Sequence, residues 1–165
     1  MLTILVKLLK ALNSEQSASQ LAIAISLAVI LGFTPILSLH NIFVVLIALW
    51  FRVNLTLLLV SYPLFAFIGF LLSSVFESVG LSILQTQSLI PVWESFFNTL
   101  VGRWSNFYYS GVMGSFVISL VTAIILFPIV KLMIRGYREK WMTKFNQFKL
   151  TKILKASKFW QLYSA

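Results

Sequence analysis

Charged residues are absent from a long apolar stretch near the start of the chain, residues 21–51. A straight helix over this stretch would be ~46 Å long, well beyond the ~30 Å hydrocarbon core of a bilayer, so the chain must bend within it. Pro35 lacks an N–H, Thr34 is biased away from helical angles because it precedes proline, and Gly32 tolerates angles that other residues avoid. The pattern predicts a broken helical hairpin over residues 17–51. A re-entrant break inside the membrane and a tight turn at the far surface both fit it.

Small residues recur at every fourth position along the first half of this hairpin. They form two rows, which are Ala18, Ala22 and Ser26 on one face and Ala24, Ala28 and Gly32 on another. Small residues at this spacing allow the backbones of two helices to approach closely in a bilayer. The first helix of the hairpin is therefore predicted to be buried among other helices.

Two further apolar stretches are long enough to cross a bilayer. Residues 55–76 carry no charge and would form ~33 Å of helix, which Pro63 is expected to kink. Residues 110–134 form the second predicted span. Small residues mark one face of that span: Gly111, Ser115, Ser119 and Ala123. We expect this face to contact either the alanine-rich first helix or another chain.

Two amphipathic segments are too short or too polar to cross. Residues 1–12 carry two lysines on one helical stripe and predict an interfacial helix. Residues 91–105 place aromatic and aliphatic side chains opposite polar ones, which predicts an external surface helix with tryptophans at headgroup depth.

Arg52 is expected at a membrane–water interface, because a charge at the bilayer centre costs roughly 2.5–3.5 kcal/mol.

Composition and charge agree with a membrane protein. The chain is 59% hydrophobic and 10% charged, with a mean hydropathy of +0.95, whereas soluble domains carry about 25% charged residues. Nine of the 13 basic residues lie within 131–165. We therefore predict an all-α, polytopic helical membrane domain over 1–134 and a basic cytoplasmic tail over 135–165, with both termini cytoplasmic. Anionic membrane lipids explain the +9 charge without nucleic acid.

Few residues could support catalysis. The chain has no cysteine and one histidine, so we expect no metal site, no cofactor and no enzyme activity. The carboxylates of Glu77 and Glu94 are expected far from His40, at the other end of a span and on the surface helix. His40 and Asn41 are interpreted as a polar pair that satisfies the broken helix, with a proton-handling or ligand role as the alternative.

An ordered set of motifs over about residues 17–84 resembles a known family. The motifs are Gly32-Phe33-x-Pro35, His40-Asn41, Arg52-x-Asn54 and the proline at Pro63. They are similar to those of small bacterial inner-membrane proteins that carry only a domain-of-unknown-function label. Relatives often have Asn-Pro where this chain has Tyr62-Pro63. The resemblance implies work in the cell envelope, beside long lipid-carrying envelope proteins.

Three classes of function remain for this sequence. The favoured one is a non-enzymatic integral membrane factor of the bacterial inner membrane. It would associate with a membrane protein partner, a second copy of itself or lipids, and would support lipid transport or envelope maintenance. The alternative is a small transporter or channel that uses the broken-helix core. A membrane enzyme is disfavoured because no acid/base pair is found.

Overall fold

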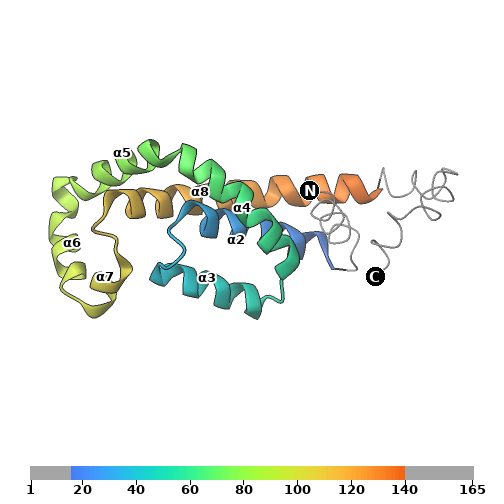
Figure 1. Ribbon diagram of the computed structural model, residues 1–165, viewed down its shortest axis with the longest axis horizontal. Helices are drawn as coiled ribbons and strands as arrows, with labels where there is room; N and C mark the ends of the chain where they lie inside the picture. The colour runs from blue at the N-terminus through green and yellow to red at the C-terminus, as the bar shows by residue number, and fades with distance from the viewer. Residues whose placement is uncertain (1–15, 140–165) are drawn as a thin grey trace, which may run out of the picture.

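The computed structural model describes residues 16–139 (Figure 1). The predicted interfacial helix at 1–12 and most of the predicted tail at 135–165 lie outside these residues. The described part is helical and has no strand, which confirms the all-α class for that part. Its elements are α2 (Ala18–Phe33), α3 (Leu39–Trp50), α4 (Leu55–Leu71), α5 (Ser73–Leu84), the 3₁₀ helix η1 (Gln87–Leu89), α6 (Ile90–Phe97), α7 (Leu100–Ser105) and α8 (Ser110–Tyr137).

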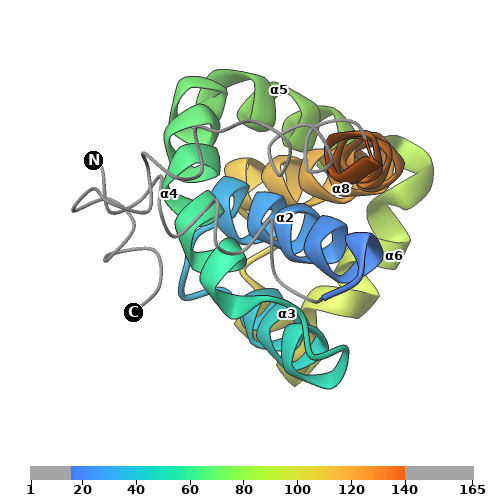
Figure 2. The ribbon, with the colours of Figure 1, turned by 90° about the vertical axis from the view of Figure 1, so that its right-hand side faces the viewer.

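Helix α2 is the centre of the bundle. It packs against α4 and α8 and has a smaller contact with α3, while α5 packs on α8. Viewed along the bundle, α2 lies between α3, α4 and α8 (Figure 2). Ten of its 16 residues are buried, on all sides of the helix. The prediction that this helix is buried among others is therefore confirmed.

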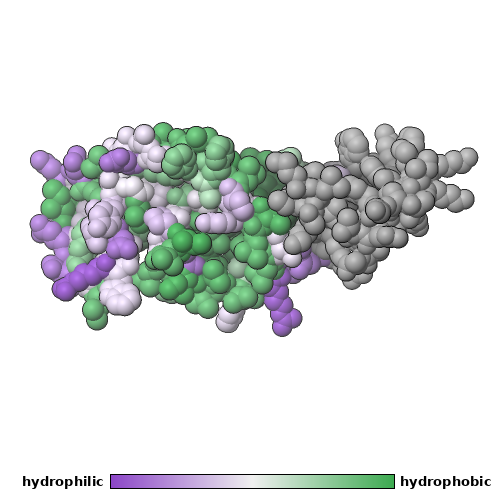
Figure 3. Space-filling view, viewed as in Figure 1, coloured by the Kyte–Doolittle hydropathy of each residue, from purple (hydrophilic) through white to green (hydrophobic). Residues whose placement is uncertain are grey.

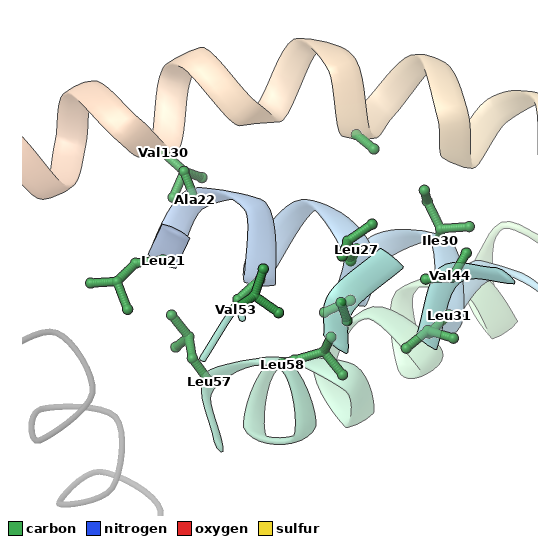
Figure 4. Packing of buried hydrophobic residues seen from close by; sticks show 14 of the residues in the cluster. Leu21, Ala22, Leu27, Ile30, Leu31, Val44, Val53, Leu57, Leu58 and Val130 are labelled. Carbon is green, nitrogen blue, oxygen red and sulfur yellow. The ribbon is translucent and has the colours of Figure 1, made fainter. Parts of the chain in front are cut away.

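Buried side chains meet on both sides of α2. Val130 of α8 lies over Ala22, and Leu57 and Leu58 of α4 approach from the opposite side (Figure 4). The small side chains on α2 leave room for larger ones from its neighbours, which is the packing that the two small-residue rows predict.

Hydrogen bonds fix the beginning of α2 and join it to the end of α8. The Ser17 side chain accepts from the backbone N–H of Gln20 at 3.2 Å, and the Gln20 side chain accepts from the N–H of Ser17 at 3.0 Å. This reciprocal cap satisfies two backbone donors that the first helical turn cannot. The Arg138 guanidinium donates to the carbonyl of Gln16 at 2.8 Å. The first described helix therefore begins where the last one ends, at one end of the bundle (Figure 1).

Two pairs of glycines bring helix backbones into direct contact. A Cβ at Gly32 would lie 2.6 Å from Cβ of Phe65, and a Cβ at Gly69 would lie 3.0 Å from the carbonyl oxygen of Gly32. Between α5 and α8, a Cβ at Gly80 or at Gly114 would overlap a backbone carbonyl of the facing helix. Gly32 is thus a packing residue within α2, and no glycine of the described part has a positive φ. Its expected role as a conformational break is wrong.

The predicted break in the first stretch is present, but the next stretch differs from its prediction. Helix α2 ends at Phe33 and α3 begins at Leu39, as Pro35 requires. Residues 55–76 were expected to form one kinked span. Instead α4 continues through Pro63, and a bend of 70° separates α4 from α5 at Leu72. Leu72 has φ −93° and ψ 7°, outside the helical region, so it turns the chain there.

The predicted surface helix over 91–105 is two helices. Asn98 ends α6 and Thr99 has extended angles, with φ −84° and ψ 158°. The Thr99 hydroxyl oxygen accepts from the N–H of Gly102 at 3.0 Å, which starts α7 as a separate helix. The apolar side chains of this stretch therefore do not share one helical face, and the single-helix prediction is wrong.

Three of the four residues of the small-residue face predicted on α8 are buried. Ser115, Ser119 and Ala123 are buried, with exposed fractions of 2%, 0% and 7%. Gly111 is exposed, and a Cβ added there would meet no atom within 4 Å. The glycine that packs on the neighbouring helix is Gly114, because its partner Gly80 lies opposite it.

By length and composition, one or two membrane crossings fit the described helices. On the same criteria, α8 is the one described helix that could cross a bilayer alone, and the bent pair α4–α5 could supply a second crossing. Helices α2 and α3 are apolar but shorter. Multi-pass topology therefore stays a prediction.

We predict that Gly114→Ala destabilises the protein by roughly 1–3 kcal/mol, because its methyl group would force α5 and α8 apart. Thermal unfolding of the purified protein in detergent measures this loss. Gly111→Ala is the matched control on the same helix, and its open surroundings predict no loss of stability. Equal melting temperatures for Gly114→Ala and the wild type would contradict the close α5–α8 contact.

Candidate functional site

The irregular segment between α2 and α3 is closed by side chains. Asn41 Nδ2 donates to the carbonyl of Pro35 at 2.9 Å, and a second carbonyl, that of Ile36, lies at 3.5 Å. The Thr34 hydroxyl lies 2.7 Å from the carbonyl oxygen of Ile30 and 3.0 Å from Oδ1 of Asn41, and both oxygens are acceptors for its proton. Backbone groups freed by a break in a membrane helix need such internal partners. Asn41 therefore performs the capping role that the sequence assigned to it.

His40 does not share that role. Its ring stacks on Phe107 at a centroid distance of 5.5 Å and an interplanar angle of 13°, and it lies 4.8 Å from the ring of Phe116. The side chain is buried, and neither ring nitrogen has a hydrogen-bond partner among the described residues. The interpretation of His40 and Asn41 as one polar pair that satisfies the break is thus wrong for His40. The imidazole joins the first turn of α3 to the segment before α8 and to α8 itself.

The corner between α3 and α4 has a strained arginine at its centre. Arg52 has φ 48°, in the left-handed region. Its N–H donates to the carbonyl of Leu49 at 3.1 Å, and the N–H of Val53 donates to the carbonyl of Ala48 at 3.1 Å. These two bonds form a Schellman motif, in which the left-handed position usually carries glycine. Asn54 then caps α4, because its Oδ1 accepts from the N–H of Leu57 at 2.9 Å.

An apolar groove separates α3 from α4. Helix α3 packs mainly on α2, through Val44 and Ala48, and touches α7 at its beginning. The space between α3 and α4 is a cavity of about 580 Å³. Its lining consists of Leu31, Ile36, Asn41, Ile42, Val45, Leu46, Ala48, Leu49, Leu55, Leu58, Leu59 and Tyr62. The groove ends near Asn41 at the break and near Leu49 and Leu55 at the Arg52 corner.

The structure groups the predicted site residues around α3, at its two ends. Gly32, Pro35, His40 and Asn41 lie at or beside the break, whereas Arg52 and Asn54 form the opposite corner. Pro63 lies within α4, next to Tyr62 in the groove lining. The helix-packing face of α8 is a separate feature, because its serines are buried inside the bundle.

Several residues of this region were missed by reading the sequence. Thr34 was noted only as the residue before a proline, and the aromatic contacts of Phe107 and Phe116 were not foreseen. The run Phe107-Tyr108-Tyr109 before α8 is the signal that could have indicated an aromatic contact. No periodic pattern links it to His40, which lies far away in the chain.

Catalytic partners for His40 are not found in the described part. Glu77 and Glu94 are exposed, and within residues 16–139 no group of three His, Asp or Glu side chains could hold a metal ion. The chemistry that this region offers is therefore apolar contact along the groove and a positive charge at one end.

We predict that His40→Phe folds and melts at the wild-type temperature or above it. The imidazole nitrogens have no hydrogen-bond partner within residues 16–139, so their loss leaves no group of that part unsatisfied, and a phenyl ring can stack on Phe107 and Phe116. Thermal unfolding tests the stability, and His40→Ala is the control that should lose roughly 2–4 kcal/mol through a cavity. A strongly destabilised His40→Phe would show that the nitrogens do have a structural role.

Comparison with known proteins gives one match. The model of a family described as an uncharacterized protein conserved in bacteria (DUF2062) matches residues 3–142, a range that includes every described helix. No curated protein and no solved structure matches the chain significantly. The resemblance to a bacterial family without an assigned function is thereby confirmed. The chain belongs to the DUF2062 family.

Proposed function

We propose that the protein is a multi-pass protein of the bacterial inner membrane that acts by association with lipids and a membrane partner. In this proposal it is not an enzyme, and it supports lipid transport or envelope maintenance. Both termini are cytoplasmic.

Exposed apolar side chains support a membrane location. Such side chains cover the outward faces of α3, α4 and α8, and hydrophobic residues dominate the middle of the molecule, while hydrophilic ones gather at the α6–α7 end (Figure 3). Soluble monomers rarely expose contiguous apolar patches larger than a few hundred Å². A lipid environment removes the cost of this surface. The side chains include Ile42, Phe43, Leu46, Leu59, Phe67, Phe70, Ile124, Ile125, Leu132 and Met133.

The arrangement of the ends supports the same topology. The Arg52 corner, the start of α2 and the end of α8 lie at one end of the bundle, and α6 and α7 lie at the other (Figure 1). Basic residues favour the cytoplasmic side, and the first of these ends carries Arg52, Lys131, Arg135 and Arg138. The α6–α7 end is then external, and α4–α5 and α8 cross the bilayer between the two sides.

The observation that carries an associative function is the exposure of α3. Only the side of this helix that carries His40, Asn41, Val44 and Ala48 is buried. Its remaining apolar side chains face outward, and several of them border the groove. We infer that these outward side chains provide the binding surface, since the core contacts of α3 are made by its opposite side.

The transporter or channel alternative has less support. A transport path needs polar groups or unwound helices around a central site. The centre of the described bundle is α2, and its side chains Leu21, Ala24, Ala28 and Val29 are fully buried apolar groups. The break that could have lined a path is closed by Asn41 and Thr34.

Single cysteines test this topology, because the natural chain has none. We expect Gln87→Cys to react with an impermeant thiol reagent in cells with a permeabilised outer membrane, and Ser157→Cys to react only after the inner membrane is opened. Mass-tagged reagent and gel electrophoresis measure the labelling. Labelling of Ser157→Cys in cells with an intact inner membrane would refute the proposed orientation.

A further inference from the structure

The groove between α3 and α4 has the features of a lipid-binding site. We propose that it holds one acyl chain of an anionic phospholipid, whose phosphate pairs with the Arg52 guanidinium. This inference rests on the proposed membrane location of α3 and specifies which lipids the protein binds.

The lining of the groove fits hydrocarbon. Asn41 and Tyr62 are the polar residues among the twelve that line it. The amide of Asn41 already forms hydrogen bonds with the Thr34 hydroxyl and the carbonyl of Pro35, so a bound molecule does not have to supply a hydrogen-bond partner for it. An alkyl chain needs no hydrogen bonds and gains dispersion contacts with leucine, isoleucine and valine side chains.

The length of the groove wall fits one leaflet. Helix α3 has 12 residues and is therefore about 18 Å long. One leaflet supplies about half of the ~30 Å hydrocarbon core, so an acyl chain reaches roughly 15 Å from its ester group. A chain that starts at the Arg52 corner would thus end near the break.

Arg52 lies at the α3–α4 corner, next in the chain to the end of the groove, although it is not itself a lining residue. Leu49 and Leu55, which line the groove, each lie three residues from Arg52, and the Arg52 N–H is bonded to the Leu49 carbonyl. Glycine would adopt the left-handed angles of Arg52 without strain, so an arginine here is conformationally unfavourable. Backbone strain of this kind clusters at functional sites, which makes the Arg52 side chain a candidate for recognition of a ligand. A guanidinium recognises a phosphate through paired N–H donors, and anionic lipids concentrate at the cytoplasmic surface on which Arg52 is proposed to lie.

Titration of the purified full-length protein with phosphatidylglycerol, followed by native mass spectrometry, tests the site. Val45 lines the groove and is 45% exposed, so Val45→Trp should fill the groove without disturbing the core. We expect it to weaken lipid binding at least tenfold. Ile47→Trp is the control, because Ile47 is on the same helix and 43% exposed but does not line the groove. It should bind as the wild type does.

The charge is tested separately. Arg52→Gln keeps a side chain in the left-handed position but removes the charge, and we expect roughly fivefold weaker binding of phosphatidylglycerol with little change for phosphatidylethanolamine. Arg52→Gly should lose the same preference while melting at a higher temperature. Arg103→Gln, at the opposite end of the bundle, should leave the lipid preference unchanged.

Three outcomes would overturn the assignment. They are wild-type binding by Val45→Trp, an unchanged lipid preference in Arg52→Gln, and a photocrosslinker at Leu46 that captures a protein in native membranes in place of phospholipid. The cysteine labelling experiment is independent, since its labels lie outside the groove. If the topology holds and the titration fails, only the groove assignment is wrong. If the labelling contradicts the topology, the cytoplasmic location of Arg52 is wrong, and lipid binding by the groove is still judged by the titration.

Discussion

Contact between helix backbones at glycine is the interaction on which the rest of this structure depends. Lipid is as apolar as leucine, so burial of apolar side chains gives little driving force between helices in a bilayer, and close packing has to supply it. Gly32 and Gly69 join α2 to α4, and Gly80 and Gly114 join α5 to α8. These contacts and the packing of α2 on α8 hold four of the described helices together, whereas α3 has smaller contacts, with α2 and α7. The groove is a consequence of that arrangement.

The sequence predicted the helical class, the break at Pro35 and the burial of α2, because each depends on local chemistry or on one repeating pattern. The bend at Leu72 could not be predicted, since neither Leu72 nor the residue on either side of it is glycine or proline. It arises because α4 packs on α2 whereas α5 packs on α8, and Pro63 is accommodated inside a continuous helix. A pattern of small residues at every fourth position also could not identify which glycine of α8 makes the close contact. Gly114 makes it because it lies opposite Gly80 of α5.

The candidate site could also be predicted only where a residue's role depends on its neighbours in the sequence. Asn41 follows a proline break closely, so its capping role is local and could be inferred. His40 is adjacent to it in sequence, but its environment is set by Phe107 and Phe116, which are distant from it in the chain. The charge of Arg52 predicted a position at the membrane–water interface. Its left-handed conformation could not be predicted, because it depends on the geometry of the whole α3–α4 corner. The groove itself exists only because two consecutive helices do not pack on each other.

The central claim is that α3 lies in the bilayer with its apolar side chains facing lipid. Spin labels at Phe43 and Ile47, in protein reconstituted into phosphatidylethanolamine–phosphatidylglycerol vesicles, test it most directly, with a label at Gln87 as the reference for a solvated site. The account predicts that both α3 labels are accessible to molecular oxygen and protected from a water-soluble nickel chelate, while the label at Gln87 has the reverse accessibility. Access of the nickel chelate to both α3 labels would contradict the claim.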